Sequence, residues 1–351
     1  MLIIQYILAL TGFSLIILVH EFGHFIFAKL SNVHVQEFFI GFGPKILKFK
    51  SKKSQTLFGI SAIPLGGYNK ILGFDRNEVV PENLKEKVFY NKPFIKKFII
   101  ISGGGIFNII FAYILIIIFL SMGVFVPTTT INYIEPSSPA DTYGFKIGDK
   151  ILEFENNKID SWDNFALLIK EYPGKEVTFK IERDSKLVDI KVKLSSVENK
   201  GYLGVAPQLI KTKLGFLKII KESSKMLWDL SVTYTKLFGM LITGKIPFEY
   251  ARPTSPVGVI SIFQQSAAMG FQNFILFVAI VSVLLAFGNF LPILPVDGGH
   301  LLIIILEAIK KRPISKKAID IYSTFGIVII VSLLIVGLVF DIISPFNIQK
   351  M

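Results

Sequence analysis

Three ionisable side chains lie within five positions near the start of the chain, at His20, Glu21 and His24. On a helix, side chains four positions apart lie on one face, so the two imidazoles can reach a single metal ion. Zinc binds imidazole nitrogen at about 2.0–2.1 Å. Glu21, next to the first histidine, is placed to accept a proton from water and not to bind the metal. The spacing therefore predicts two zinc ligands and a general base.

A pattern this short also arises by chance in soluble sequences, so its surroundings decide its meaning. It follows directly on an apolar stretch at 2–19. Each ionisable residue inside a membrane helix costs about 2.5–3.5 kcal/mol, so three of them in five positions require a function. The alternative is that the helix has already ended before residue 20 and that these side chains are interfacial.

Two histidines leave zinc one ligand short, because catalytic zinc sites generally use three protein ligands and a water molecule. The metzincin pattern would supply a glycine and a third histidine where this chain has Phe27 and Leu30, so that class is excluded. His34 and Glu37 follow on the polar loop. The chain has no cysteine, which excludes zinc–thiolate sites and thiol catalysis. The remaining ligand must be a histidine or a carboxylate.

Asp297 is a lone carboxylate just after the apolar stretch 274–294. The prolines before it and the glycine pair after it break the helix, and backbone groups freed at membrane depth need a protein-lined cavity. A carboxylate at that depth is best explained by a cation, so we predict Asp297 as the third zinc ligand. His300 is the nearby alternative, which we interpret as an interfacial residue at the start of a helix.

Two asparagines lie in apolar surroundings. Asn108 follows the glycine cluster 103–105, and Asn289 lies two turns before Asp297. An intramembrane asparagine tends to hydrogen-bond across helices. We predict that Asn289 contacts the substrate backbone or a developing oxyanion. For Asn108 a substrate contact and a structural packing contact are both open.

Four apolar stretches dominate the 351-residue chain, at 2–19, 98–120, 274–294 and 323–343. A helix of about 20 residues crosses the ~30 Å of hydrocarbon in a bilayer. Only 18% of the residues are charged, against about one quarter in soluble proteins. We therefore predict four transmembrane helices. The first stretch has no basic start and no small-residue cleavage site, so we interpret it as a retained helix and not as a cleaved signal.

The formal net charge of +12 is concentrated in two segments. Residues 31–97 hold 12 Lys and Arg against 5 Asp and Glu, and residues 307–320 hold 5 against 2, whereas 121–273 hold 19 against 16. Basic loops stay in the cytoplasm, so we predict that 121–273 lies outside the cell and the metal site near the cytoplasmic side. The charge indicates topology and some contact with anionic lipid, and not nucleic-acid binding.

The remaining segments differ in pattern. Alternating apolar and polar residues between Gly and Pro breaks in 38–68 predict hairpins that lean into the inner leaflet, with an ordinary interfacial hairpin as the alternative. Residues 127–208 contain strand-like runs and two helical pieces, enough for one α+β domain. Apolar spacing of three and four in 211–244 predicts an amphipathic helix, on the outer membrane surface or against that domain.

The predicted fold class is a multi-pass α-helical membrane protein with four transmembrane helices, a membrane-associated β-hairpin region and an α+β domain. Its parts, in chain order, are a first transmembrane helix with the zinc motif (1–30), a cytoplasmic-side loop with hairpins (31–97), a second transmembrane helix (98–120), the α+β domain (127–208), an outer helical segment (211–272), a third transmembrane helix with the third ligand (273–297), a cytoplasmic-side connection (298–320) and a fourth transmembrane helix (321–345).

These motifs together resemble the site-2 protease family of intramembrane zinc proteases, and most closely the branch of the bacterial regulator of sigma-E protease. The segment 20–24 looks like the zinc helix of that family, 41–44 and 63–68 are similar to its β-hairpin region, and 289–298 looks like its Asn-x-x-Pro…Asp-Gly segment. Residues 138–140, 144–149 and 161–162 resemble parts of a PDZ domain. The match covers nearly the whole chain. Gly105 stands where the family commonly has proline, and Val296 where leucine is frequent.

The resemblance implies a zinc metalloendopeptidase of the bacterial inner membrane that cuts single-pass membrane proteins, such as an anti-sigma factor or a signal-peptide remnant, in regulated intramembrane proteolysis. It implies substrate contacts at Gly41 and Gly43, in a hairpin region whose edge strands can accept an extended substrate. It also implies a single PDZ domain that filters substrates by size or docks a shortened end. The alternatives are a catalytically silent PDZ scaffold and a metal transporter.

Overall fold

The computed structural model describes residues 2–76, 78–245 and 252–346. Residues 246–251 of the predicted outer helical segment 211–272 lie outside the described residues. The chain divides into two compact units. One comprises Met1–Leu120 and Phe216–Met351, and the other is Ser121–Gly215.

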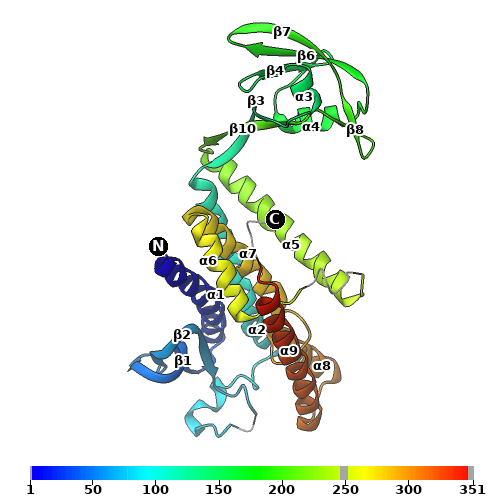
Figure 1. The fold of residues 1–351 in the computed structure, drawn as a ribbon. Helices are drawn as coiled ribbons and strands as arrows, with labels where there is room; N and C mark the ends of the chain where they lie inside the picture. The colour runs from blue at the N-terminus through cyan, green and yellow to red at the C-terminus, as the bar shows by residue number, and fades with distance from the viewer. Residues whose placement is uncertain (1, 77, 246–251, 347–351) are drawn as a thin grey trace. The chain divides into compact units, whose positions relative to one another are not determined.

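Four helices of the first unit are long and apolar enough to cross a membrane. They are α1 (Leu2–Leu30), α2 (Phe94–Ser121), α7 (Phe271–Asn289) and α9 (Lys316–Ile343) (Figure 1). A helix that is apolar on all sides is either buried in a large core or in contact with lipid. Since much of the apolar surface of these helices is exposed, they face lipid. The four predicted transmembrane helices are confirmed, and the chain is a multi-pass membrane protein.

Three further helices complete this unit: α5 (Phe216–Ile242), α6 (Pro256–Ala268) and α8 (Asp297–Lys310). The sequence predicts an amphipathic helix in the region of α5. In the structure α5 packs against α7, and its Ser224 hydroxyl forms a hydrogen bond with the Tyr113 hydroxyl of α2. Helix α6 packs against α1, α7 and α9, with the Phe263 ring fully buried. Neither α6 nor α8 was assigned as a separate helix from the sequence, because both are too short to show a membrane-spanning apolar run.

The hairpin region is a curled sheet of two long strands, β1 (Val35–Lys50) and β2 (Leu57–Ile71), after which a short 3₁₀ helix (Glu82–Lys87) leads to α2. The first half of β1 pairs on both sides, since Phe39 lies opposite both Gly59 and Tyr68. The sheet therefore has four segments, and within the described residues the end of β2 at 67–71 pairs on one side only. That end forms an edge beside α1, because β2 packs on that helix.

The second unit is an α+β domain built on an antiparallel sheet. The strands of this sheet are β3 (Val124–Ile134), β4 (Lys150–Phe154), β5 (Asn157–Lys158), β6 (Glu176–Arg183), β7 (Lys186–Lys193) and β10 (Val205–Thr212). Their order is β10-β3-β4-β6-β7, with β5 beside β4, and β8 (Ser195–Val197) pairs with β9 (Lys200–Tyr202). Two short helices, α3 (Pro139–Thr142) and α4 (Trp162–Ile169), accompany the sheet. This mixed content confirms the predicted class of the domain.

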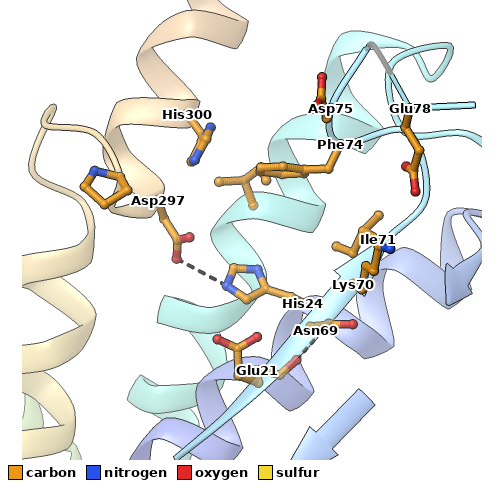
Figure 2. Close-up of a pocket in the computed structure, with 12 residues that line it drawn as sticks. Glu21, His24, Asn69, Lys70, Ile71, Phe74, Asp75, Glu78, Asp297 and His300 are labelled. Atoms are coloured by element: carbon orange, nitrogen blue, oxygen red, sulfur yellow. Dashed lines mark hydrogen bonds and ion pairs between the residues drawn. The ribbon is translucent and has the colours of Figure 1, made fainter. Parts of the chain in front are cut away.

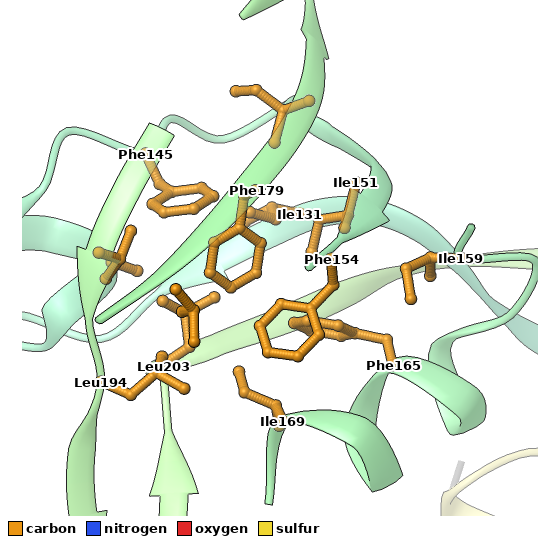
Figure 3. Packing of buried hydrophobic residues seen from close by; sticks show 14 residues of the cluster. Ile131, Phe145, Ile151, Phe154, Ile159, Phe165, Ile169, Phe179, Leu194 and Leu203 are labelled. Atoms are coloured by element: carbon orange, nitrogen blue, oxygen red, sulfur yellow. The ribbon is translucent and has the colours of Figure 1, made fainter. Parts of the chain in front are cut away.

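The core of this domain is aromatic. The Phe154 and Phe179 side chains are fully buried, with ring centroids 5.0 Å apart, and Phe165 from α4 packs on both (Figure 3). Aromatic pairs at such separations add about 0.5–1.5 kcal/mol beyond the burial of their area. Ser138 and Ser161 cap the two helices through their side-chain oxygens. The domain thus has its own core and its own helix-end signals.

Candidate metal centre

Helix α1 carries the His-Glu-x-x-His pattern without interruption. It continues from Leu2 to Leu30, so the alternative that the helix ends before residue 20 is wrong. His20 and His24 face the interior of the helix bundle, with only 7% of each residue exposed. The spacing of four residues brings both Nε2 atoms to 3.2 Å from each other. The helix therefore presents two imidazole nitrogens to one point.

Asp297 completes a three-ligand group with these histidines. Its Oδ2 atom lies 3.1 Å from His20 Nε2 and 3.3 Å from His24 Nε2. A tetrahedral ion bound at about 2.0–2.1 Å separates its ligand atoms by roughly 3.3 Å, which matches all three separations. Asp297 Oδ2 is also a buried oxygen without a hydrogen-bond partner, and a buried carboxylate oxygen needs a compensating partner. The three residues therefore fit a zinc ion.

Glycines of α2 leave the space that such an ion needs. A Cβ atom on Gly104 would lie 2.5 Å from His24 Nε2 and 2.6 Å from His20 Nε2. Where α1 and α2 cross, a Cβ on Gly23 would collide with the carbonyl oxygen of Gly103. The two helix backbones thus approach each other directly at the centre. The glycine cluster, predicted to allow close helix packing, has this role in the structure.

A polar group lies next to the Nδ1 atom of each histidine. His24 Nδ1 lies 2.9 Å from the carbonyl oxygen of Ile100, which accepts its proton and leaves Nε2 free to bind metal. Asn108, fully buried, has its Nδ2 atom 3.5 Å from His20 Nδ1, while its Oδ1 is without a partner. If the oxygen and nitrogen of the Asn108 amide exchange places, Oδ1 accepts a hydrogen bond from His20 Nδ1, which leaves His20 Nε2 free to bind metal.

The break between α7 and α8 places Asp297. Helix α7 ends at Asn289, and α8 begins at Asp297 itself. A Cβ on Gly298 would collide with the backbone of Phe290 and Leu291, so the chain can fold back this tightly only with glycine there. The sequence signals for a helix break therefore aim the carboxylate at α1.

A cavity of about 590 Å³ opens onto the centre. Its lining includes Glu21, His24 and Asp297, together with Asn69 from the edge of β2 (Figure 2). The Asn69 Nδ2 group donates a hydrogen bond of 3.2 Å to the backbone oxygen of Glu21, and its Oδ1 is buried without a partner. The cavity thus joins the glutamate, the ligand group and the edge strand in one space.

The other residues considered as ligands lie elsewhere. Glu37 accepts hydrogen bonds from Lys45 and Tyr68, both at 2.7 Å. Burial alone would raise the pKa of Glu37, but these two bonds, together with the charges of Lys45 and Lys70, lower the pKa. His34 lies directly before β1 and does not join the group of described residues that could hold an ion.

His300 lines the cavity without joining that group either. Its ring packs at 4.8 Å on Phe74, edge to face. Burial lowers the pKa of His300, against the opposing effect of Asp297. Its position on the first turn of α8 agrees with the predicted helix-start residue.

The predicted substrate contacts are spread over the unit. Asn289 is the last residue of α7, half-buried, and its side chain makes no hydrogen bond with the described residues. Gly41 and Gly43 lie in the middle of β1 with positive φ angles of 83° and 86°, a region that favours glycine. None of the three lines the cavity at the metal centre.

Sequence reasoning missed Asn69 and the Ile100 carbonyl. A polar side chain within the apolar strand 57–71 is the signal that could have indicated Asn69. No signal of that kind exists for Ile100, because it acts through its backbone.

A histidine–histidine–aspartate group with an adjacent glutamate, set among membrane-spanning helices, defines a membrane-embedded metallohydrolase. The family profile described as Peptidase family M50 matches residues 8–333. The chain belongs to this family of zinc metalloproteases. A relative from Clostridium acetobutylicum, named as a candidate zinc metalloprotease, is 30% identical over 344 residues, which cover 97% of this chain and 98% of the relative.

The chain is also similar to a named protease and, over a short part, to a solved structure. The zinc metalloprotease RasP of Oceanobacillus iheyensis is 27% identical over 411 residues, covering 92% of this chain and 95% of RasP. Among solved structures, the PDZ domain of an SdrC-like protein from Listeria innocua is 22% identical and covers 23% of this chain and 92% of that domain, at a TM-score of 0.21. At this TM-score the likeness establishes no fold for the α+β domain.

Replacing Asp297 by alanine is expected to release the zinc ion. Two histidines alone leave the ion one protein ligand short, so the zinc content of the purified protein should fall from about one ion per chain to a small fraction. Elemental analysis by mass spectrometry measures this directly. His300→Ala is the matched control, since it lies on the same turn of α8 and should keep its zinc. Equal losses in both variants would contradict the assignment of Asp297.

Proposed function

We propose that this chain is an intramembrane zinc endopeptidase that cuts the transmembrane segments of single-pass membrane proteins. The observation that carries this proposal is that two of the three ligand residues, His20 and His24, lie on α1, a helix long and apolar enough to cross a membrane. At about 1.5 Å per residue, His20 lies roughly 27 Å along α1 from Leu2, near the far edge of the hydrocarbon layer. A hydrolytic centre at that depth meets peptide bonds of membrane-spanning segments.

The proposed chemistry follows from the residues around the cavity. His20, His24 and Asp297 would hold zinc, which when bound polarises the scissile carbonyl and lowers the pKa of water. Glu21 takes a proton from the attacking water and donates it to the leaving amine. Asn69 fixes the backbone at Glu21 through its hydrogen bond. Water reaches the glutamate through the cavity that both residues line.

The edge of β2 is the proposed platform for the substrate. A helix hides its amides in internal hydrogen bonds, so hydrolysis requires an extended substrate. The residues 67–71 offer an edge beside Glu21, to which an extended segment can add as a further strand. The Asn289 side chain, which makes no hydrogen bond within the described part of the chain, would contact the substrate backbone, and Gly41 and Gly43 shape the hairpin region that carries the edge. Asn108 is proposed to orient the His20 imidazole through a hydrogen bond with His20 Nδ1.

The second unit is proposed to be a PDZ domain that lies outside the cell. The nearly balanced charge of 121–273, against the basic segments 31–97 and 307–320, supports this orientation. The bacterial inner membrane, with the metal centre near its cytoplasmic side, is the proposed location. Such a domain would admit a substrate only after the part of the substrate outside the cell has been shortened, as for an anti-sigma factor or a signal-peptide remnant.

The purified protein in vesicles provides the test. Single-pass polypeptides with an apolar segment that contains a glycine or proline should be cut inside that segment, and mass spectrometry of the products locates the cut. The chelator 1,10-phenanthroline should stop the reaction and added Zn²⁺ should restore it. Cleavage confined to soluble polypeptides, or cleavage that survives the chelator, would refute the proposal.

A further inference from the structure

A second cavity, separate from the metal centre, is lined by four cationic side chains. It encloses about 280 Å³ where α2 begins, α8 ends and the chain turns toward α9. The cations are Arg76, Lys97, Lys311 and Arg312. Among the described residues that line this cavity, Glu307 is the one carboxylate. The cavity therefore has an excess of positive charge.

Glu307 is already fully engaged. Its two carboxylate oxygens accept hydrogen bonds of 3.0 and 2.8 Å from Arg76, and one of them also accepts the Ile314 amide at 3.0 Å. The Glu307 side chain is only 12% exposed. Arg76 and Glu307 thus neutralise each other at the wall of the cavity. The single charge of Glu307, which also acts on Lys97, leaves the lining with a net excess of three positive charges.

The three other cations of the cavity are not part of this pair. Within the described part of the chain, Lys97, Lys311 and Arg312 form no ion pair. Like charges around one small space repel one another, and an anion placed among them would remove that cost. The cluster therefore favours a negatively charged ligand over an empty cavity.

The start of α2 adds to this preference. Phe94, the first residue of this 28-residue helix, lines the cavity, and Lys97 follows one turn later. The first amides of a helix have no partners within the helix and carry a partial positive charge, which makes helix starts binding sites for phosphate. The helix start and the three cations thus act together on the same space.

The rest of the lining is apolar. Phe94, Ile304, Ala308 and Pro313 form the other wall. Outside it, Ile309 on α8 is 71% exposed, as expected for a side chain in contact with lipid. A ligand that fits both walls has an anionic head and an apolar continuation.

We propose that this cavity binds the phosphate group of an anionic phospholipid. The site lies at membrane-helix ends on the side of the basic segments, where anionic headgroups are found and where basic pockets between helices bind them. Inorganic phosphate shares the headgroup chemistry but lacks the apolar part. The proposal is independent of the protease function, since no residue of the metal centre lines this cavity.

The test is lipid binding by the full-length protein. Native mass spectrometry after transfer from vesicles of phosphatidylcholine with phosphatidylglycerol should show phosphatidylglycerol retained on the protein. The combined variant Lys97→Met, Lys311→Asn and Arg312→Gln should bind it about a hundredfold more weakly. Asparagine suits position 311, because its φ of 53° lies in the left-handed region. The single variant Arg312→Gln, at an exposed residue, should lose about fivefold.

A matched control removes three other lysines from the basic side. Lys48→Gln, Lys52→Gln and Lys53→Gln change the charge equally but lie in the hairpin region, away from the cavity. This control should keep phosphatidylglycerol bound as the unchanged protein does. Equal losses in the control and in the cavity variants would overturn the site. Inorganic phosphate that raises the thermal unfolding midpoint in pure phosphatidylcholine as much as phosphatidylglycerol does would overturn the lipid assignment.

Discussion

Replacing Glu21 by glutamine is expected to stop peptide hydrolysis while zinc stays bound. Glutamine has the size of glutamate but accepts no proton from water, so the general-base contribution, typically 10²–10⁴-fold, is lost. The ligand atoms come from His20, His24 and Asp297 and are unchanged. Single-turnover cleavage of a single-pass substrate in vesicles measures the rate, and elemental analysis of the same sample measures the zinc content.

Glu78→Gln is the control for this experiment. Glu78 lines the same cavity, but its two carboxylate oxygens accept one hydrogen bond each, from Gln36 and from the Gly73 amide, so glutamine keeps one of these bonds and does not touch the ligand group. Its cleavage rate should stay close to that of the unchanged protein. A Glu21→Gln protein that cuts at the full rate would show that Glu21 is not the general base of the reaction.

The membrane helices are the part of the fold that sequence predicts well. An uninterrupted apolar run of about 20 residues has one stable place, since its backbone must be satisfied internally within hydrocarbon. The first helix runs to Leu30, well past the apolar stretch 2–19, as the predicted span 1–30 has it, whereas α7 ends at Asn289, before the apolar stretch 274–294 does. Polar residues such as His20 and Glu21 end the apolar run in the sequence but do not end the helix. Their helical position is stabilised by packing on α2, which hydropathy does not show.

Short and doubly paired elements could not be predicted in this way. Helix α6 packs on the neighbouring α7 but also on α1 and α9, which are far from it in the sequence. The first half of β1 pairs with two parts of β2, as Phe39 shows. Alternation predicts which side chains share a face of a strand, but it does not give the number of neighbouring strands.

The candidate site shows the same difference between residues that local sequence predicts and contacts that depend on distant elements. His20 and His24 follow from helix periodicity, and Asp297 from a helix break at an apolar end, so the sequence predicts each of them locally. The contacts that position them come from other elements, as with the Ile100 carbonyl behind His24 and the Asn69 amide at Glu21. Spacing within one segment carries no information on these contacts.

The second large effect is expected at a glycine with no chemical group of its own. In Gly104→Ala the new methyl carbon would lie 2.5 Å from His24 Nε2 and 2.6 Å from His20 Nε2, well inside the contact distance of about 3.5–4.0 Å. His24 cannot turn away freely, because its other ring nitrogen is bonded to the Ile100 carbonyl. We expect zinc affinity to fall by about a hundredfold or more, since even outer-shell changes cost 10–100-fold.

The helix itself should not suffer from this change, which separates a metal effect from a folding effect. Alanine is favoured over glycine in a helix by about 0.8–1.0 kcal/mol, so α2 gains local stability in Gly104→Ala. Gly288→Ala in α7 is the control, since a Cβ there meets nothing within 4 Å. It should keep its zinc and its cleavage rate. The expected loss in Gly104→Ala comes only from the space that the new methyl group takes beside His20 and His24. Full zinc occupancy in that variant would therefore mean that the zinc is bound elsewhere and not between these two imidazoles.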